Sequence, residues 1–198
     1  MTDQRPTDVL LWRARLEGHG VPQRLSLTGG LRPACVAWSL SEALVHVYAR
    51  LPIREFVDLD NLSSRFSLNV DGAPAANVPL CRLESVLDLP GASHAAMPEA
   101  HYVVETASDP GWMDEIARWY ADEHLPGLAA VAGCVAARRY INHDDVRCSL
   151  ACYDLVGADV LRSPAWLAVR ETEWSSRTRP HFTHTTRTMF ANITETSR

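Results

Sequence analysis

Of all the features of the sequence, the order of predicted strands and helices in the second half of the chain constrains the fold most. Stretches rich in β-branched and aromatic residues predict strands, and helical spacing of apolar residues predicts the helices between them. In chain order these are a strand at 100–108, a helix that ends near Leu125, strands at 133–141 and 146–156, a helix at 165–174 and a strand at 181–193. The order β-α-β-β-α-β is that of a ferredoxin-like unit, so the expected fold class is α+β.

The first half repeats this order in a weaker form. It predicts strands at 8–16, 34–40 and 43–51, a helix at 53–66 and a last strand at 78–89. The first helix of the unit is not predicted in this half, because residues 17–33 contain four glycines, Gly18, Gly20, Gly29 and Gly30. We therefore expect no helix of three or more turns in that span.

Short matches support a duplication. The triplet Cys-Val-Ala occurs at 35–37 and again at 134–136, an offset of 99 residues. Together with the element order, this predicts a degenerate ferredoxin-like half at 1–90, a linker at 91–100 and a second half at 101–198. We expect the two halves to be related by a pseudo-twofold axis.

Composition excludes several functions. The net charge is −5 and the chain contains no lysine, which argues against a nucleic-acid partner and excludes a Schiff-base mechanism through a side-chain amine. Five cysteines without a CxxC motif indicate buried thiols in a reducing cytoplasm. No apolar run approaches the length of a membrane span, so we expect a soluble cytoplasmic protein with no membrane partner.

A family resemblance depends on four motifs: WYADEHLPGL, ARRY ahead of a hairpin, SPAW and RTRPHF. Together they resemble the EthD-like branch of the dimeric α/β-barrel superfamily over about residues 100–190. The resemblance implies ferredoxin-like units whose sheets face each other, here as an intrachain barrel of tandem halves around an apolar cavity. The superfamily includes cofactor-free monooxygenases, haem enzymes, lactone isomerases, and polyketide cyclases or dehydratases. The first half lacks these motifs, and its nearest counterpart of EHLP is GHGVP at 18–22, without the acid.

The stretch RWYADEHLPGL at 118–128 carries the first candidate site. At the end of a helix the cationic form of His124 is favoured by the helix dipole, and Glu123 can orient it. Tyr120 lies one helical turn earlier, and Trp119 is a candidate substrate-binding residue. A histidine with a pKa near neutrality can transfer a proton in either direction. The alternative is that His124 only caps the helix by bonding a carbonyl group.

Two further groups are candidate substrate-binding residues. Arg138 and Tyr140 share one face of a predicted strand and Arg139 takes the other, so one arginine can anchor an anionic or carbonyl group. His181 and His184 lie on opposite faces of the last strand. The alternative for both groups is an exposed polar strand face.

The sequence thus favours an enzyme that performs cofactor-free acid–base chemistry, namely dehydration, isomerisation or cyclisation, on an aromatic or polyketide-like small molecule. A non-catalytic ligand-binding or assembly module of the same fold is the alternative, and a haem-binding oxidoreductase is the third. No metal site is expected, because HExxH and similar spacings do not occur. A homodimer is left open.

Overall fold

A computed structural model of the chain describes residues 3–15, 24–39, 43–75 and 78–192. These residues form two compact units. Among the described residues, unit 1 comprises those up to Ser85, Asn142–Asp145 and residues 190–192. Unit 2 comprises Val86–Ile141 and Val146–Met189. The predicted boundaries at 90 and 100 stay a prediction, as does the pseudo-twofold axis.

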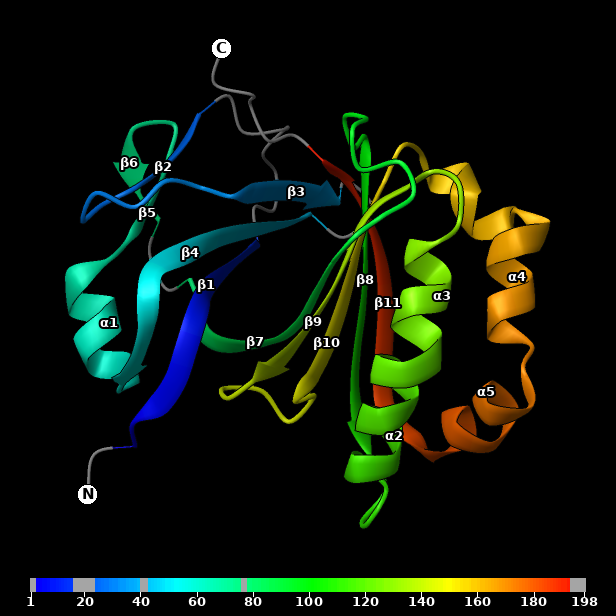
Figure 1. Cartoon of the computed structure of the whole chain (residues 1–198). Coiled ribbons are helices and arrows are strands. Elements are labelled where there is room, and N and C mark those ends of the chain that lie inside the picture. The colour runs from blue at the N-terminus through cyan, green and yellow to red at the C-terminus, as the bar shows by residue number, and fades with distance from the viewer. Residues whose placement is uncertain (1–2, 16–23, 40–42, 76–77, 193–198) are drawn as a thin grey trace. The chain divides into compact units, whose positions relative to one another are not determined.

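Unit 2 has the element order that the sequence predicts (Figure 1). Its strands and helices are β8 (Ala100–Ser108), α2 (Met113–Trp119), α3 (Leu125–Ala129), β9 (Cys134–Asn142), β10 (Ser149–Leu155), α4 (Pro164–Arg170), α5 (Glu173–Thr178) and β11 (Phe182–Asn192). The hydrogen-bonded order β11-β8-β10-β9 places the first and third strands of the unit in the middle. The four helices cover one face of this sheet, where they bury a core that includes Ile116, Trp166 and Tyr153.

Unit 1 repeats this strand order with fewer helices. Its elements are β1 (Arg5–Arg15), β2 (Leu25–Leu27), β3 (Cys35–Ser39), β4 (Leu44–Val57), α1 (Leu59–Arg65), β5 (Leu68–Val70) and β6 (Ala73–Pro74). Its hydrogen-bonded order is β7-β1-β4-β3, where β7 is Leu80–Pro90. As in unit 2, the first and third of these strands in chain order lie in the middle. Leu10, Trp12 and Val47 belong to its apolar core.

Three strands, β7, β9 and β11, have residues in both units. The eight long strands follow the closed order β1-β4-β3-β11-β8-β10-β9-β7. This is the order of an intrachain α/β barrel built from ferredoxin-like units, so the predicted fold class is confirmed.

Several predicted boundaries were wrong. The helix expected at 53–66 is shorter, because β4 stays extended to Val57 and Asp58 then caps α1 by accepting from the Asn61 amide at 2.7 Å. The helix expected at 165–174 is divided into α4 and α5 by Thr172, whose hydroxyl caps α5. Of residues 17–33, those at 24–33 contain β2 and no helix, as expected. Residues 16–23 lie outside the described residues, as do residues 40–42, where the strands predicted at 34–40 and 43–51 meet.

The predicted linker packs tightly on unit 2. Gly91 and Ser93 donate their amides to the carbonyls of Val135 and Cys134. A side chain at Gly91 would meet the Cys134 carbonyl oxygen at 2.1 Å, so only glycine fits there. All five cysteines are free thiols, and among the described residues no helix is long and apolar enough to cross a membrane.

Candidate functional site

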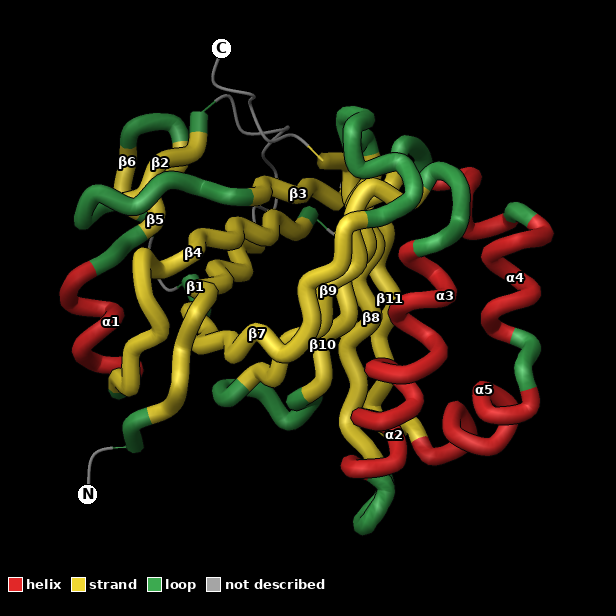
Figure 2. Tube along the Cα trace, viewed as in Figure 1, coloured by secondary structure: helices red, strands yellow, loops and turns green. Residues whose placement is uncertain are grey.

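The helix that carries the first candidate residues continues past its predicted end. Between α2 and α3 lies a π-helical segment, Tyr120–His124, and the three pieces form one continuous helix (Figure 2). The Leu125 amide bonds the Tyr120 carbonyl, five residues back, and Pro126, which has no amide hydrogen to donate, follows at once. The wide turn lets the helix pass a proline that would otherwise break it. Such π segments are frequent at functional sites.

This segment brings three aromatic rings together. The rings of Trp119 and His124 are stacked with centroids 4.0 Å apart, and those of Tyr120 and His124 meet edge-on at 5.5 Å. Trp119 is 1% exposed and Tyr120 2% exposed, and Phe182 from β11 packs against both. The segment therefore buries Tyr120 and His124 against the sheet. A regular α-helix would direct these two side chains differently, because it has fewer residues per turn.

The buried rings form one wall of a pocket between the helices and the sheet of unit 2. The enclosed volume is about 30 Å³, enough for a water molecule or two. Its other lining residues are Tyr102, Val104, Leu128, Tyr153, Trp166, Arg170, Arg179, Phe182 and Arg187. All of the lining residues belong to unit 2; a cavity enclosed by both sheets stays a prediction.

His124 is neutral in this site. It is 8% exposed, and its Nδ1 has no hydrogen-bond partner. Burial, followed by the positive charges of Arg179 and Arg170, lowers its pKa from 6.5 to about 3. The expectation of a cation favoured by the helix end was wrong, because the helix continues to Ala129 and the ring points into the core.

Glu123 does not hold His124. Its carboxylate accepts a hydrogen bond from the Thr172 hydroxyl at 2.6 Å, and the charges that shift the pKa of His124 are those of arginines. Thr172 also caps α5. Glu123 therefore ties the π segment to the start of α5, and its predicted contact with His124 is replaced by this bond.

Three arginines line the same pocket from three different elements. Arg170 ends α4, Arg179 lies in the short turn before β11, and Arg187 lies on β11. Burial, together with the charges of Arg170 and Arg187, lowers the pKa of Arg179. The structure records no ion pair of any of the three with a carboxylate in the described part of the chain. Sequence reasoning did not select them as candidates, although Arg179 lies in the RTRPHF motif.

The predicted strand faces at 138–140 are correct, yet none of these residues lines the pocket. Arg138 donates to Asp154 at 2.5 Å and to Asp88 at 3.0 Å. Arg139 faces the helices, where its guanidinium carbon lies 4.7 Å from the centre of the Tyr120 ring. Tyr140 is buried, on the same face as Arg138.

The two predicted histidines of the last strand also lie away from the pocket. His181 stacks on Trp112 with centroids 3.4 Å apart and pairs with Asp109 at 3.0 Å. Asp109 lies ahead of α2, which starts at Met113. His184 is exposed with φ of 49°, so the simple alternation assumed for this strand does not hold there.

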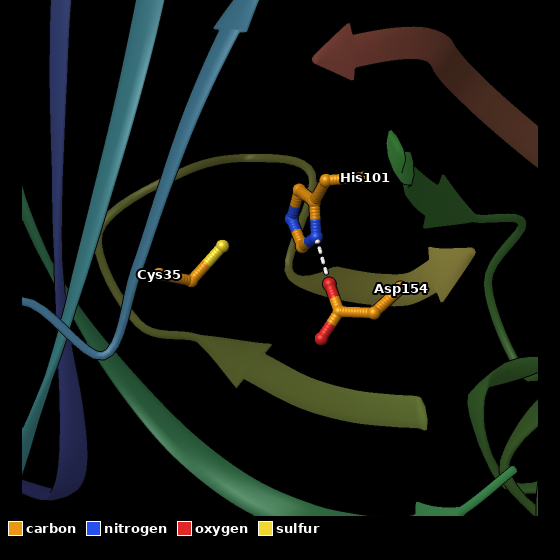
Figure 3. Close-up of side chains that lie close together, drawn as sticks. All are labelled: Cys35, His101 and Asp154. Carbon is orange, nitrogen blue, oxygen red and sulfur yellow. Dashed lines mark hydrogen bonds and ion pairs between the residues drawn. The ribbon is translucent and has the colours of Figure 1, made fainter. Parts of the chain in front are cut away.

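A second buried histidine was not predicted. Nδ1 of His101 lies 2.7 Å from Asp154 (Figure 3). The other carboxylate oxygen of Asp154 accepts a hydrogen bond from Arg138. Burial would raise the pKa of Asp154, but the hydrogen bonds and charges of His101 and Arg138 lower it to about 2. Asp154 is therefore a buried carboxylate that is paired on both oxygens, which is typical of a structural ion pair.

Comparison with known proteins establishes the fold. No protein-family model and no curated protein matches the chain. Among solved structures, a candidate monooxygenase from Fusobacterium nucleatum subsp. nucleatum is 9% identical over 95% of this chain and 93% of that one, with a TM-score of 0.57. A candidate monooxygenase from Lactobacillus acidophilus is 7% identical over 96% and 95%, with a TM-score of 0.57. An anthrone oxidase-like protein is 11% identical over 97% and 92%, with a TM-score of 0.54. At these identities the likeness shows a ferredoxin-like α/β barrel, and function has to be argued from the site.

Proposed function

We propose that the chain is a small-molecule enzyme that transfers a proton without a bound cofactor, in a dehydration, isomerisation or cyclisation of an aromatic or polyketide-like substrate. One observation carries the proposal. Nδ1 of His124 is buried without a partner at the wall of an aromatic pocket. Buried polar atoms are nearly always hydrogen-bonded, so an orphaned one calls for an explanation. A substrate that supplies the missing partner explains it.

His124 has a free lone pair for a proton, and a pKa of about 3 makes it a weak base until an anion in the pocket offsets the charges of Arg179 and Arg170. With a pKa of about 3, the imidazole of His124 is neutral at physiological pH and can accept a proton from a C–H or O–H acid. The three pocket arginines stabilise the negative charge left on the substrate. That charge in turn stabilises the imidazolium as it forms. Burial raises the pKa of Tyr120 to about 12, so its hydroxyl stays protonated and can donate a hydrogen bond to the substrate.

Motif positions support the resemblance to the EthD-like branch, and we propose membership of it. EHLP forms the end of the π segment and the start of α3, and SPAW forms the start of α4. Both stretches contribute pocket residues, His124 and Trp166. A homodimer stays a prediction that sedimentation would check.

Cofactor-free oxygenation is a second candidate. Two of the similar structures are candidate monooxygenases and one is anthrone oxidase-like. Removal of a proton to give a stabilised carbanion is a step that an isomerase and such an oxygenase would share. The haem-binding alternative stays a prediction: a porphyrin, like an aromatic substrate, is larger than the volume of about 30 Å³ beside His124 and requires the lining side chains to move, and a Soret band in the purified protein would reveal it.

Proton exchange tests the proposal. The protein should catalyse exchange of the acidic methylene hydrogens of anthrone with D₂O under anaerobic conditions, followed by NMR. His124→Gln should abolish the acceleration and shift the Tm by only a few degrees, equivalent to roughly 1 kcal/mol. His181→Gln is the matched control and should exchange at the wild-type rate. Admission of oxygen then separates the two candidates, since only an oxygenase consumes it.

Retained exchange in His124→Gln would refute the assignment of the base. Binding of anthrone without any exchange would favour the non-catalytic ligand-binding module.

A further inference from the structure

The pocket of unit 2 is lined by hydrogen-bond donors and positive charge. Arg170, Arg179 and Arg187 converge on it, and Nε1 of Trp119 lies buried at its wall without an acceptor. No aspartate or glutamate is among its lining residues. A guanidinium presents several donors in one plane and matches the two oxygens of a carboxylate.

The arginines repel one another when the pocket holds no anion. The pKa of Arg179 is lowered by burial and then by Arg170 and Arg187, and the same three arginines oppose the rise that burial causes in the pKa of Tyr102. Arginines that stabilise a fold usually pair with a carboxylate, as Arg138 does with Asp154. Arg179 donates only to the Arg170 carbonyl, at 3.3 Å, and among the described residues none of the three is recorded in an ion pair. Three guanidiniums without a carboxylate in one pocket are the arrangement expected of an anion-binding site.

Burial separates the pocket into two parts. Trp119, Tyr153 and Trp166 are each 1% exposed and form its inner wall. Arg170 and Arg179 are half-buried and Arg187 is exposed, so the arginines form the side nearer to solvent. A ligand larger than the present volume of 30 Å³ requires the lining side chains to move. Long, partly exposed arginine side chains can do so without opening the core.

We infer that the substrate is an aromatic carboxylic acid, bound with its ring system against the buried aromatic wall and its carboxylate between Arg170, Arg179 and Arg187. This inference names the substrate class of the proposed enzyme and rests on the same pocket. The carboxylate is a permanent charge of the substrate, separate from the negative charge that develops when His124 removes a proton. Three guanidiniums are enough to serve both.

Binding of a matched pair of probes tests this inference. Naphthalene-2-carboxylate and naphthalene-2-carboxamide share the ring system and differ in charge, and calorimetry gives the Kd of each. The carboxylate should bind at least tenfold more tightly, and this preference should shrink at high salt as the charges are screened. Arg179→Gln and Arg187→Gln should each abolish most of the preference, whereas Arg162→Gln, which removes an exposed arginine outside the pocket, should retain it.

Ligand-free stability gives a second measurement. Because Arg187 carries repulsion and no ion pair, Arg187→Gln should leave the Tm of the free protein unchanged or raise it at low salt. Equal binding of acid and amide, no binding of either probe at millimolar concentration, or an equal loss in Arg162→Gln would overturn the inference. His124→Gln should keep the preference for the acid, so a failure of the proposed proton transfer is distinguishable from a failure of the anion site.

Discussion

Buried His124 should make the protein labile to acid, and His124→Gln should remove part of that lability. The unfolded chain takes up a proton on this residue at the ordinary pKa of 6.5, whereas the folded protein does so only at about 3. Above pH 6.5 the two states bind equal numbers of protons and the residue has no effect. As the pH falls from 6.5 toward 3, the unfolded state binds the extra proton and stability is lost.

The magnitude follows from these two pKa values. Over the whole interval the loss is roughly 5 kcal/mol, and between pH 7 and pH 4 it is roughly 3 kcal/mol. In urea denaturation this corresponds to a decrease of about 1 to 2 M in the midpoint. The wild type should therefore lose roughly 3 kcal/mol more than His124→Gln between pH 7 and pH 4, because all other titrating groups are common to both proteins.

The control is His181→Gln, which removes a partly exposed histidine paired with Asp109. This variant should keep the wild-type dependence on pH. If His124→Gln and the wild type instead lose stability in parallel, His124 is solvated or paired in the folded protein, and the description of a neutral, buried base is refuted.

Three further substitutions test the packing around the pocket. Gly91→Ala should destabilise the protein by at least about 2 kcal/mol in urea denaturation, because the new methyl group meets the Cys134 carbonyl oxygen at 2.1 Å; an unchanged midpoint would contradict the close approach. Thr172→Val removes both the α5 cap and the bond to Glu123 and should cost about 2 kcal/mol in the same assay, where Thr172→Ser should restore most of the loss. Ser163→Ala removes only the α4 cap and should cost about 1 kcal/mol; a loss as large as that of Thr172→Val would show that the cap has a further partner.

The regular elements of unit 2 could be predicted because their signals are local. The strand expected at 100–108 has those bounds, and Ser163 caps α4 through the Trp166 amide at 3.2 Å, ahead of Pro164. These signals depend on residues adjacent in sequence, so they hold before any tertiary contact forms. The strand order of both units followed from the element order, since few topologies satisfy it.

The π segment could not be predicted in the same way. Pro126 and Gly127 together indicate a helix end, and α3 continues through both. One added residue in the turn accommodates the proline, and a side chain at Gly127 would meet Val169 of α4 at 2.8 Å. The wide turn and the close packing at Gly127 both depend on contacts with other elements of the fold. The turn is stabilised by burial of Tyr120 and His124.

The candidate site was predicted in part. The sequence directed attention to Trp119, Tyr120 and His124, all of which line the pocket, because aromatic residues and histidine at helical spacing share a face. It assigned the anchoring arginines to positions 138 and 139, and the pocket contains others, at 170, 179 and 187. Those three come from separate elements, so only the folded chain brings them together.

The protonation state of His124 tests the account most directly. NMR of the protein with isotope-labelled histidine should follow the imidazole signals from pH 8 to the acid limit of folding. The account predicts a neutral ring throughout the range above pH 5 in the free protein, consistent with a pKa of about 3. Saturation with naphthalene-2-carboxylate should raise this pKa, because an anion offsets the charges of Arg170 and Arg179. A His124 pKa near 6.5 in the free protein, or one that does not respond to the anion, would contradict the account.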